Sequence, residues 1–244
     1  MTLKAILFDL DGTLIDFNPS EFMKTYLTTA SMFFQDIIPD NKQFIDELLA
    51  STYVMEVIDN NEKYALDVFL DDFSPKFNIN REQIKERFKE FYSTKFDVIQ
   101  PLITNLENSA EKLQTLQNTY PELNLVLATN PVFPLIAIRR RMQWGGLEPE
   151  YFKHITHAEN SIYCKGNLKY WIETAKAVNC DPSQCLVVGN DVKRDMIAKK
   201  AGFTTFLVEQ TIENGETHAI EELVDYKGGL ADMLNLVADW NKRS

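Results

Sequence analysis

The stretch Leu3-Lys4-Ala5-Ile6-Leu7-Phe8-Asp9-Leu10-Asp11-Gly12-Thr13 decides the fold of this chain. It begins as a short apolar run and ends abruptly in acid, which is typical of a strand buried on both faces of a parallel sheet. Similar runs recur at 123–128, 185–188 and 204–208, with a brief strand expected at 154–156. Between them we expect helices at 109–117, 134–144, 168–178 and 230–240, and one more that runs to Lys200 and ends at Gly202. Strands that alternate with helices predict an α/β fold with a doubly wound parallel sheet.

A helical block interrupts this alternation directly after the first strand. From about 20 to 100, aromatic and aliphatic residues recur at helical spacing, and glycine is absent from 13 to 144. Asn80 precedes one such segment as a candidate N-cap. We therefore expect an α/β core made of residues 1–16 and 101–244, with an all-helical cap inserted at 17–100.

Composition and charge exclude several classes of protein. The 244 residues are 45% apolar and 25% charged, as in a soluble globular protein of one large domain, with or without an insertion. The net charge of −11 disfavours nucleic acid as a partner. The one tight cationic cluster, Arg139-Arg140-Arg141, would fan around a helix, so we interpret it as a solvated helix surface. The sequence carries no signal for an oligomeric state.

Membrane insertion and secretion are also disfavoured. No apolar run approaches the roughly 20 residues that cross a bilayer. The opening residues reach Asp9 too soon for a signal peptide. The cysteines Cys164, Cys180 and Cys185 lack metal-type spacing, and their odd number favours reduced thiols. We therefore expect a cytoplasmic protein.

Polar residues follow three of the predicted strands at their carboxyl ends, where open α/β sheets bind ligands. They are Asp9, Asp11 and Thr13 after the first strand, Thr129 and Asn130 after the second, and Asn190 and Asp191 after the third; Lys165 opens a helix between the last two. Carboxylates grouped in this way repel one another unless a cation lies among them. Mg²⁺ prefers oxygen ligands and keeps a substrate phosphate in its shell. The pattern predicts a site for a divalent cation and a phosphoryl group.

The order of these residues resembles the haloacid dehalogenase-like superfamily over essentially the whole chain. Asp9-Leu10-Asp11-Gly12-Thr13 is similar to its first motif, Thr129 to the second and Lys165 to the third. The segment Gly189-Asn190-Asp191-Val192-Lys193-Arg194-Asp195 is similar to its acidic fourth motif. A helical insertion after the first motif is also where this family places one type of cap.

The resemblance implies a role for each matched residue. Asp9 would attack phosphorus and form an aspartyl-phosphate, and Asp11 would serve as general acid and then as general base. Thr129 and Lys165 would bind the phosphoryl group and complete the catalytic set, while Asn130 either contacts substrate or only forms an Asn-Pro turn. Mg²⁺ would be held by Asp9, by the backbone carbonyl of Asp11 and by Asp191.

The fourth motif departs from its commonest spelling. Many relatives have Gly-Asp where this chain has Gly189-Asn190. Alignment on Asp195 makes Asp191 the metal ligand, which we favour because a carboxylate suits Mg²⁺ better than an amide does. The alternative is that the amide oxygen of Asn190 takes that place. Asp195 would be a second ligand or a support, and Gly166 replaces a proline that often follows the motif lysine.

Several functions are compatible with this fold. A haloacid dehalogenase needs no acid two residues after its nucleophile, so Asp11 favours phosphoryl transfer. A phosphomutase and a non-catalytic phosphate-binding or interaction protein stay open as alternatives. A signalling receiver domain is about half this length and lacks a large cap. The expected enzyme is a magnesium-dependent phosphatase, and an enclosing cap favours a small phosphorylated metabolite as substrate.

Overall fold

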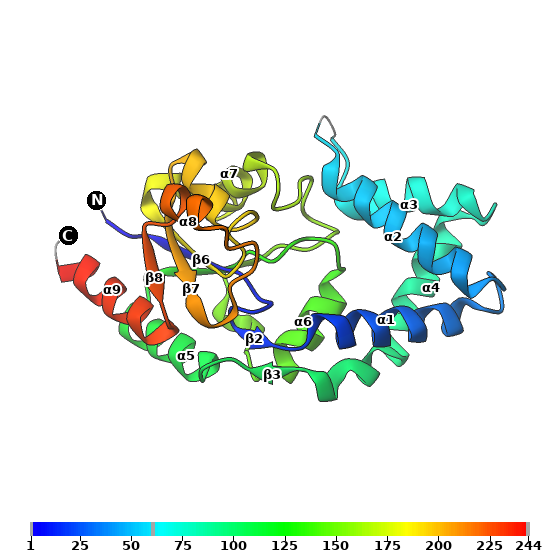
Figure 1. Ribbon diagram of the computed structural model, residues 1–244, viewed down its shortest axis with the longest axis horizontal. Helices are drawn as coiled ribbons and strands as arrows, with labels where there is room; N and C mark the ends of the chain where they lie inside the picture. Colours follow the sequence, from blue (N-terminus) through cyan, green and yellow to red (C-terminus); the bar gives the residue numbers. More distant parts are fainter. Residues whose placement is uncertain (1, 60–61, 243–244) are drawn as a thin grey trace.

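The centre of the molecule is a six-stranded sheet in which every paired strand is parallel (Figure 1). The structure, a computed structural model, describes residues 2–59 and 62–242. The strand order is β5-β4-β1-β6-β7-β8. The strands are β1 (Ala5–Phe8), β4 (Asn124–Leu127), β5 (His154–Ile155), β6 (Cys185–Gly189), β7 (Thr204–Val208) and β8 (Tyr226–Gly228). The chain winds outward from β1 in one direction and then in the other, which confirms the predicted doubly wound α/β fold.

Helices cover both faces of the sheet because alternate strand residues point to opposite sides. Ile6 and Phe8 of β1 pack with α5 (Ser109–Thr119) and α9 (Leu230–Lys242) on one face. Ala5 and Leu7 pack with α7 (Leu168–Ala177), α8 (Thr217–Leu223) and the 3₁₀ helix η4 (Met196–Ala201) on the other. The helix α6 (Leu135–Trp144) follows β4. A sheet buried on both faces explains the apolar runs of the sequence.

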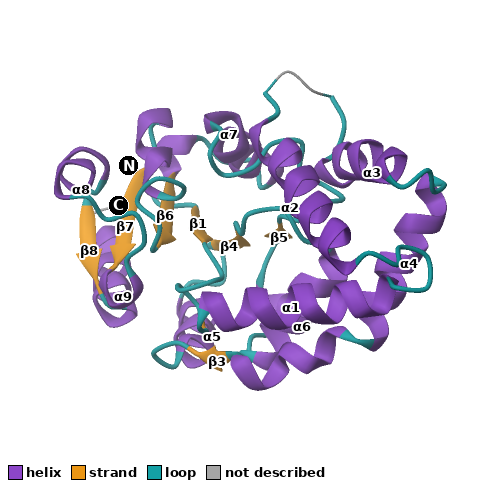
Figure 2. Ribbon diagram, turned by 45° about the vertical axis from the view of Figure 1, so that its right-hand side comes forward, coloured by secondary structure: helices purple, strands orange, loops and turns teal. Residues whose placement is uncertain are grey.

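The first four α-helices after β1 pack together to one side of the sheet (Figures 1 and 2). They are α1 (Pro19–Phe34), α2 (Asn41–Val57), α3 (Ala65–Lys76) and α4 (Arg81–Thr94), followed by the 3₁₀ helix η1 (Phe96–Leu102). Asn18, Asp40 and the predicted Asn80 cap the N-termini of α1, α2 and α4 through their side chains. An antiparallel pair of short strands, β2 (Ile15–Asp16) and β3 (Thr104–Asn105), joins the two chain segments that enter and leave these helices.

The core of the helical block is aromatic. Phe34 is fully buried, and its ring centroid lies 4.9 Å from that of Phe44 and 4.6 Å from that of Phe88. Phe73 packs edge-on against Phe44, with centroids 5.9 Å apart. Offset and edge-to-face ring pairs of this kind add to the free energy of apolar burial. The aromatic residues at helical spacing therefore form the core of this block.

The structure differs from the predicted secondary structure in several elements. The segment before Gly202 is the short 3₁₀ helix η4 rather than a full α-helix, because the loop from Gly189 to Asp195 occupies its first turns. The strands β2, β3 and β8 and the helix α8 were not predicted. Strands of two or three residues carry too few side chains to show a period.

The arginine cluster at the end of α6 also differs from its interpretation as a solvated surface. Only Arg139 is exposed, whereas Arg140 is half-buried and pairs with Asp97. Arg141 is buried, with 1% of its surface exposed. Three consecutive residues on a helix point in different directions, so one of them turned inward toward the sheet edge.

No helix among residues 2–59 and 62–242 is both long and apolar enough to cross a bilayer.

Candidate active site

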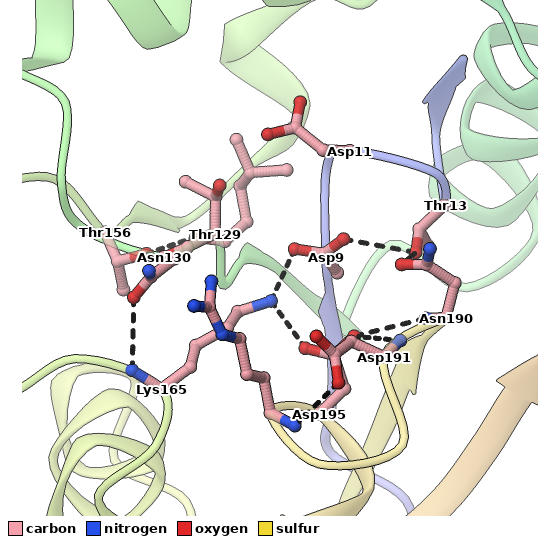
Figure 3. A network of polar contacts seen from close by, with 12 residues as sticks. Asp9, Asp11, Thr13, Thr129, Asn130, Thr156, Lys165, Asn190, Asp191 and Asp195 are labelled. Carbon is pink, nitrogen blue, oxygen red and sulfur yellow. Dashed lines mark hydrogen bonds and ion pairs between the residues drawn. The ribbon is translucent and has the colours of Figure 1, made fainter. Parts of the chain in front are cut away.

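The predicted site residues meet at the carboxyl edge of the sheet, beside the switch in strand order between β1 and its neighbours (Figure 3). The backbone N–H of Asp9 donates to the carbonyl of Val188 on β6, at 2.9 Å. On the other side, Ala128 donates to the carbonyl of Phe8 at 2.7 Å. Asp9 therefore sits directly between the ends of β4 and β6. This placement follows from the parallel register, which aligns all three strand ends at one edge.

A buried ion triad forms the floor of the site. The ammonium of Lys165 donates to Oδ1 of Asp9 and, at 2.6 Å, to Oδ1 of Asp195. Lys165 and Asp195 are 2% and 1% exposed, and Asp9 is 7% exposed. Ions this deeply buried need partners of opposite charge within hydrogen-bond distance. The predicted lysine and the predicted nucleophile are thus in direct contact.

Burial and neighbouring charge act in opposite directions on the pKa values of Asp9 and Lys165. Burial raises the pKa of Asp9 to about 7; Lys165 acts to lower it, while Asp195 and Asp11 act to raise it further. Burial acts to lower the pKa of Lys165, but the carboxylates of Asp195 and Asp9 outweigh it and raise that pKa. Lys165 is therefore a permanent cation, whereas Asp9 needs more positive charge nearby to stay ionised at neutral pH.

The turn after β1 is held by Gly12, Thr13 and Asn190. Gly12 has φ +73°, and a Cβ there would lie 2.3 Å from the side-chain nitrogen of Asn190, so only glycine fits. The hydroxyl of Thr13 lies 3.3 Å from Oδ2 of Asp9 and 3.3 Å from Oδ1 of Asn190, and can donate to one of them at a time. The Asn190 amide also donates to the carbonyl of Thr211, at 2.8 Å. Both polar atoms of Asn190 therefore contact protein groups.

Asp191 and Asp195 shape the loop after β6. Asp195 accepts the backbone N–H groups of Asn190 and Asp191 at 3.1 and 3.0 Å, besides its ion pair with Lys165. Asp191 accepts the N–H groups of residues 193 and 194 on Oδ1 and the amide of Asn214 on Oδ2. Asp191 as a whole residue is 8% exposed, and it borders the same cavity as Asp9. Asp195 thus supports the loop, while Asp191 faces the cavity.

Asp11 contacts a residue that the sequence analysis did not single out. Its carboxylate is turned away from Asp9 (Figure 3) and accepts hydrogen bonds from Nη1 of Arg141, at 2.9 Å to Oδ1 and 2.7 Å to Oδ2. The Asp11 side chain is 34% exposed, whereas that of Arg141 is 1% exposed. No local signal separates Arg141 from its two arginine neighbours, so only the fold identifies it.

Thr129 and Asn130 border the cavity from the end of β4. The carbonyl of Thr129 accepts the hydroxyls of Thr156 and Tyr170, at 2.8 and 2.9 Å, which fixes the backbone there. The Asn130 amide accepts the N–H of Lys165 at 3.3 Å and donates to Glu56 of α2 at 2.7 Å. Asn130 therefore links the lysine loop to the helical block, in addition to facing the cavity.

The cavity at this edge has a volume of about 220 Å³ and brings all predicted site residues together. Phe17 and three residues at the start of α1 (Pro19, Phe22 and Met23) line one side, and Phe133 lines another. Glu213, which the sequence analysis missed, adds a carboxylate whose pKa is raised by burial and by Asp191. Acidic groups thus predominate in a partly enclosed space.

The donor set fits a hard divalent cation. Among residues 2–59 and 62–242, no three carboxylate, imidazole or thiolate groups stand in a ready-made metal cluster. Asp9, Asp191 and Glu213 nevertheless present carboxylate oxygens to one cavity, with the ammonium of Lys165 already shared by Asp9 and Asp195. Burial raises the pKa values of Asp9 and Glu213, and neighbouring carboxylates raise them further, so a cation among these groups would stabilise their ionised forms. Oxygen ligands in such a setting suit Mg²⁺.

Comparison with known proteins agrees with this geometry. The family of haloacid dehalogenase-like hydrolases matches residues 3–202, and the chain belongs to that family. This confirms the predicted family and the enzyme class, a hydrolase. The chain is 24% identical over 238 residues to the pyrophosphatase PpaX of Bacillus velezensis, covering 95% of each protein.

Solved structures with the same fold include two described as phosphatases. A HAD phosphatase from Thermococcus onnurineus superposes with a TM-score of 0.60 at 16% identity, covering 96% of this chain and 98% of that one. A predicted phosphoglycolate phosphatase from Haemophilus somnus gives 0.58 at 17% identity, covering 97% and 98%. These similarities confirm the fold around the site.

Proposed function

We propose that the protein is a magnesium-dependent phosphatase that hydrolyses a small phosphate ester through an aspartyl-phosphate at Asp9. The observation that carries this proposal is the direct contact of Lys165 with Asp9. Asp11, two residues after Asp9, borders the same cavity. A nucleophile, an acid two residues later and a buried ammonium are the groups that phosphoryl transfer requires.

Each step can be assigned to a residue of the cavity. A carboxylate oxygen of Asp9 attacks phosphorus while the bond from phosphorus to the ester oxygen breaks, and Asp11 gives its proton to the leaving oxygen. Asp11 then takes a proton from water as that water attacks phosphorus, which releases phosphate and restores Asp9. The Asp11 side chain is 34% exposed and borders the cavity that contains Asp9.

The remaining residues position charge. The ammonium of Lys165 offsets the negative charge on Asp9 and on the phosphoryl group, and the Thr129 side chain is placed to bind a phosphoryl oxygen. Asp9, the Asp11 carbonyl and Asp191 would hold Mg²⁺, which supplies charge neutralisation at the phosphoryl oxygens. Because the side chain of Asn190 contacts Thr13 and Thr211, we assign the fourth-motif ligand to Asp191.

The helical block is proposed as a cap, with residues 17–100 inserted into a core of 1–16 and 101–244. Glu56 and Asp59 of α2 and the loop beyond it contact Asn130, Arg194 and Lys169 on the sheet side. A cavity of about 220 Å³ closed by residues at the start of α1 suits a small substrate. The names of the pyrophosphatase and the phosphoglycolate phosphatase that resemble this chain also denote small phosphate compounds.

The test is hydrolysis of 4-nitrophenyl phosphate by the purified protein. We expect turnover with Mg²⁺, loss of turnover with EDTA and recovery when Mg²⁺ is added in excess. Asp9→Asn should abolish turnover, because an amide cannot attack phosphorus as a carboxylate does. Chelator-resistant hydrolysis would refute the metal role, and near-normal turnover by Asp9→Asn would refute the nucleophile.

A further inference from the structure

The guanidinium of Arg141 is buried with most of its donors unused. Only Nη1 has acceptors, the two oxygens of Asp11. Nε and Nη2 are buried and meet no acceptor among the residues that the structure describes. An arginine side chain carries five N–H donors, so three of them, one on Nε and two on Nη2, point at no protein oxygen.

An arrangement of this kind is unfavourable unless something else accepts those hydrogens. Each buried donor without a partner costs about 1–3 kcal/mol, and the cost is larger for a charged group. The rings of Phe133 and Phe22 lie near the guanidinium, with its carbon 4.8 and 5.9 Å from their centroids. Ring faces attract the cation but accept little hydrogen bonding. The unused N–H groups therefore call for an oxygen from outside the chain.

Arg141 also borders the cavity that contains Asp9 and Lys165. The other arginine of that cavity, Arg194, has a side chain that is 50% exposed and pairs with Glu56 at 3.3 Å, so its remaining donors are open to solvent. Arg141 differs from both neighbouring cations: Lys165 is bound by two carboxylates, and Arg194 is half-exposed, whereas Arg141 is buried and has one carboxylate partner. Its charge is countered by Asp11 alone among the described residues.

We infer that Arg141 binds an oxyanion group of the substrate other than the phosphoryl group that is transferred. Nε and Nη2 present parallel N–H groups, and this edge of a guanidinium matches a carboxylate or a phosphate in a two-point contact. The inference rests on the proposed function and specifies its substrate class: a phosphate compound with a second anionic group.

The position of Arg141 also limits where that second group lies. Asp11 has to reach the leaving oxygen to protonate it, and Arg141 is in hydrogen-bond contact with Asp11. The second anion must therefore lie close to the leaving oxygen, only a few bonds away. A cavity of about 220 Å³ agrees with such a compact dianionic substrate. The same contact lets the bound anion influence Asp11, because both share one guanidinium.

The experiment compares matched substrates that differ only in the second charge. The phosphate ester of glycolic acid is set against that of glycolamide, and ethane-1,2-diyl bisphosphate against 2-methoxyethyl phosphate, so that both members of each pair expel an alkoxide; the two pairs distinguish a carboxylate from a phosphate as the group bound. The quantity measured with Mg²⁺ is the ratio of kcat/KM within each pair. We expect a ratio of about 30 or more in favour of the charged member of at least one pair, as charge-assisted hydrogen bonds give.

Arg141→Met and Arg141→Lys should each lower that ratio by about tenfold or more, since neither offers the two-point contact. Arg139→Met, on the exposed side of the same helix, is the matched control and should leave the ratio unchanged. A structural role for Arg141 would instead lower both members of a pair equally, which would overturn the inference. So would a ratio near one for both pairs in the unaltered protein, a result that needs no folded variant.

Binding separates failure of this inference from failure of the proposed function. Asp9→Asn should not turn over these esters, so calorimetry can compare the affinities of phosphoglycolate and phosphoglycolamide directly. Tighter binding of the charged ester supports the role of Arg141 even in the absence of hydrolysis. Equal affinities would refute it, even where 4-nitrophenyl phosphate is hydrolysed with Mg²⁺.

Discussion

The carboxyl edge of the sheet buries ionisable side chains, whereas the helical block α1–α4 buries aromatic ones. At the edge, Asp9, Lys165 and Asp195 are nearly as buried as the core, yet all three are ionisable. In the block, Phe34, Phe44 and their aromatic neighbours fill the interior with rings. Buried charge costs free energy of folding, whereas buried rings supply it. The buried charges at the edge therefore lower the stability of the fold, and the buried rings of the block are among the contacts that offset this loss.

This contrast separates chemistry from specificity. Of the groups proposed for catalysis, Asp9, Asp11 and Thr129 lie on loops directly after strands, whereas Lys165 lies in the loop before α7. The groups that would select a substrate arise where the block meets the sheet, such as Phe22 of α1 beside Arg141 of α6. Changing one region should therefore affect turnover, and changing the other should affect stability or selectivity.

The largest effect is expected from Lys165→Met at the sheet edge. Loss of the ammonium leaves Asp9 and Asp195 buried without their shared cation and removes charge that would stabilise the transferred phosphoryl group. We expect kcat/KM for 4-nitrophenyl phosphate to fall by about 10³-fold or more. The measurement is steady-state kinetics, after circular dichroism has shown that the variant is folded.

Lys176→Met on the exposed side of α7 is the matched control and should retain full activity. A folded Lys165→Met variant whose activity stays within tenfold of the unaltered protein would show that the ammonium takes no part in turnover. The claim that changes at the sheet edge affect turnover would then fail for Lys165.

The residues at the carboxyl edge of the sheet could be predicted from the sequence because short segments of the chain carry the pattern. The run into Asp9, Asp11 and Gly12 contains a strand, a turn and two acids within a few residues, and the structure brings them to one cavity with Thr129, Lys165 and Asp191. The doubly wound sheet and the all-helical stretch were likewise visible as periods of apolar residues. Boundaries shifted by one or two residues, as at β4 and α9.

The remaining features depend on contacts between distant segments. Arg141 is separated from Asp11 by 130 residues, and nothing in three consecutive arginines shows which one turns inward. Glu56 reaches Asn130 only once α2 has packed beside the sheet. Asn190 contacts Thr13 and Thr211 because Gly12 leaves room for its amide. None of these contacts produces a period or a motif in the sequence.

A smaller effect, on stability rather than turnover, is expected from Phe34→Ala in the helical block. Phe34 is fully buried among Phe33, Phe44 and Phe88, so its removal leaves a cavity that the neighbouring rings cannot fill. Substitutions of this kind lower the free energy of unfolding by about 3–5 kcal/mol. Urea denaturation measures the loss, with the exposed Met32→Ala as control.

Phe34 does not border the cavity at the sheet edge. We therefore expect the folded Phe34→Ala variant to keep kcat within about threefold, since the catalytic groups are unchanged. A large loss of turnover in the folded variant would mean that packing inside the block and turnover at the edge are coupled, so the two regions would not have separate roles.

The smallest effect tests whether the edge truly costs stability. Burial raises the pKa of Asp9 to about 7 in the folded protein, above its ordinary value of 3.8. The folded state then holds a proton on Asp9 that the unfolded chain releases, so the stability of the protein declines as pH rises from about 4 to 7 and stays reduced above pH 7.

Asp9→Asn removes this penalty. In EDTA, its melting temperature should exceed that of the unaltered protein by about 2–4 °C at pH 8, and the difference should shrink toward pH 5. The exposed Asp16→Asn should show no such trend. A lower melting temperature for Asp9→Asn at pH 8 would mean that its ion pair with Lys165 outweighs the cost of burial. Asp9 would then stabilise the edge, and the contrast with the aromatic block would no longer hold for that residue.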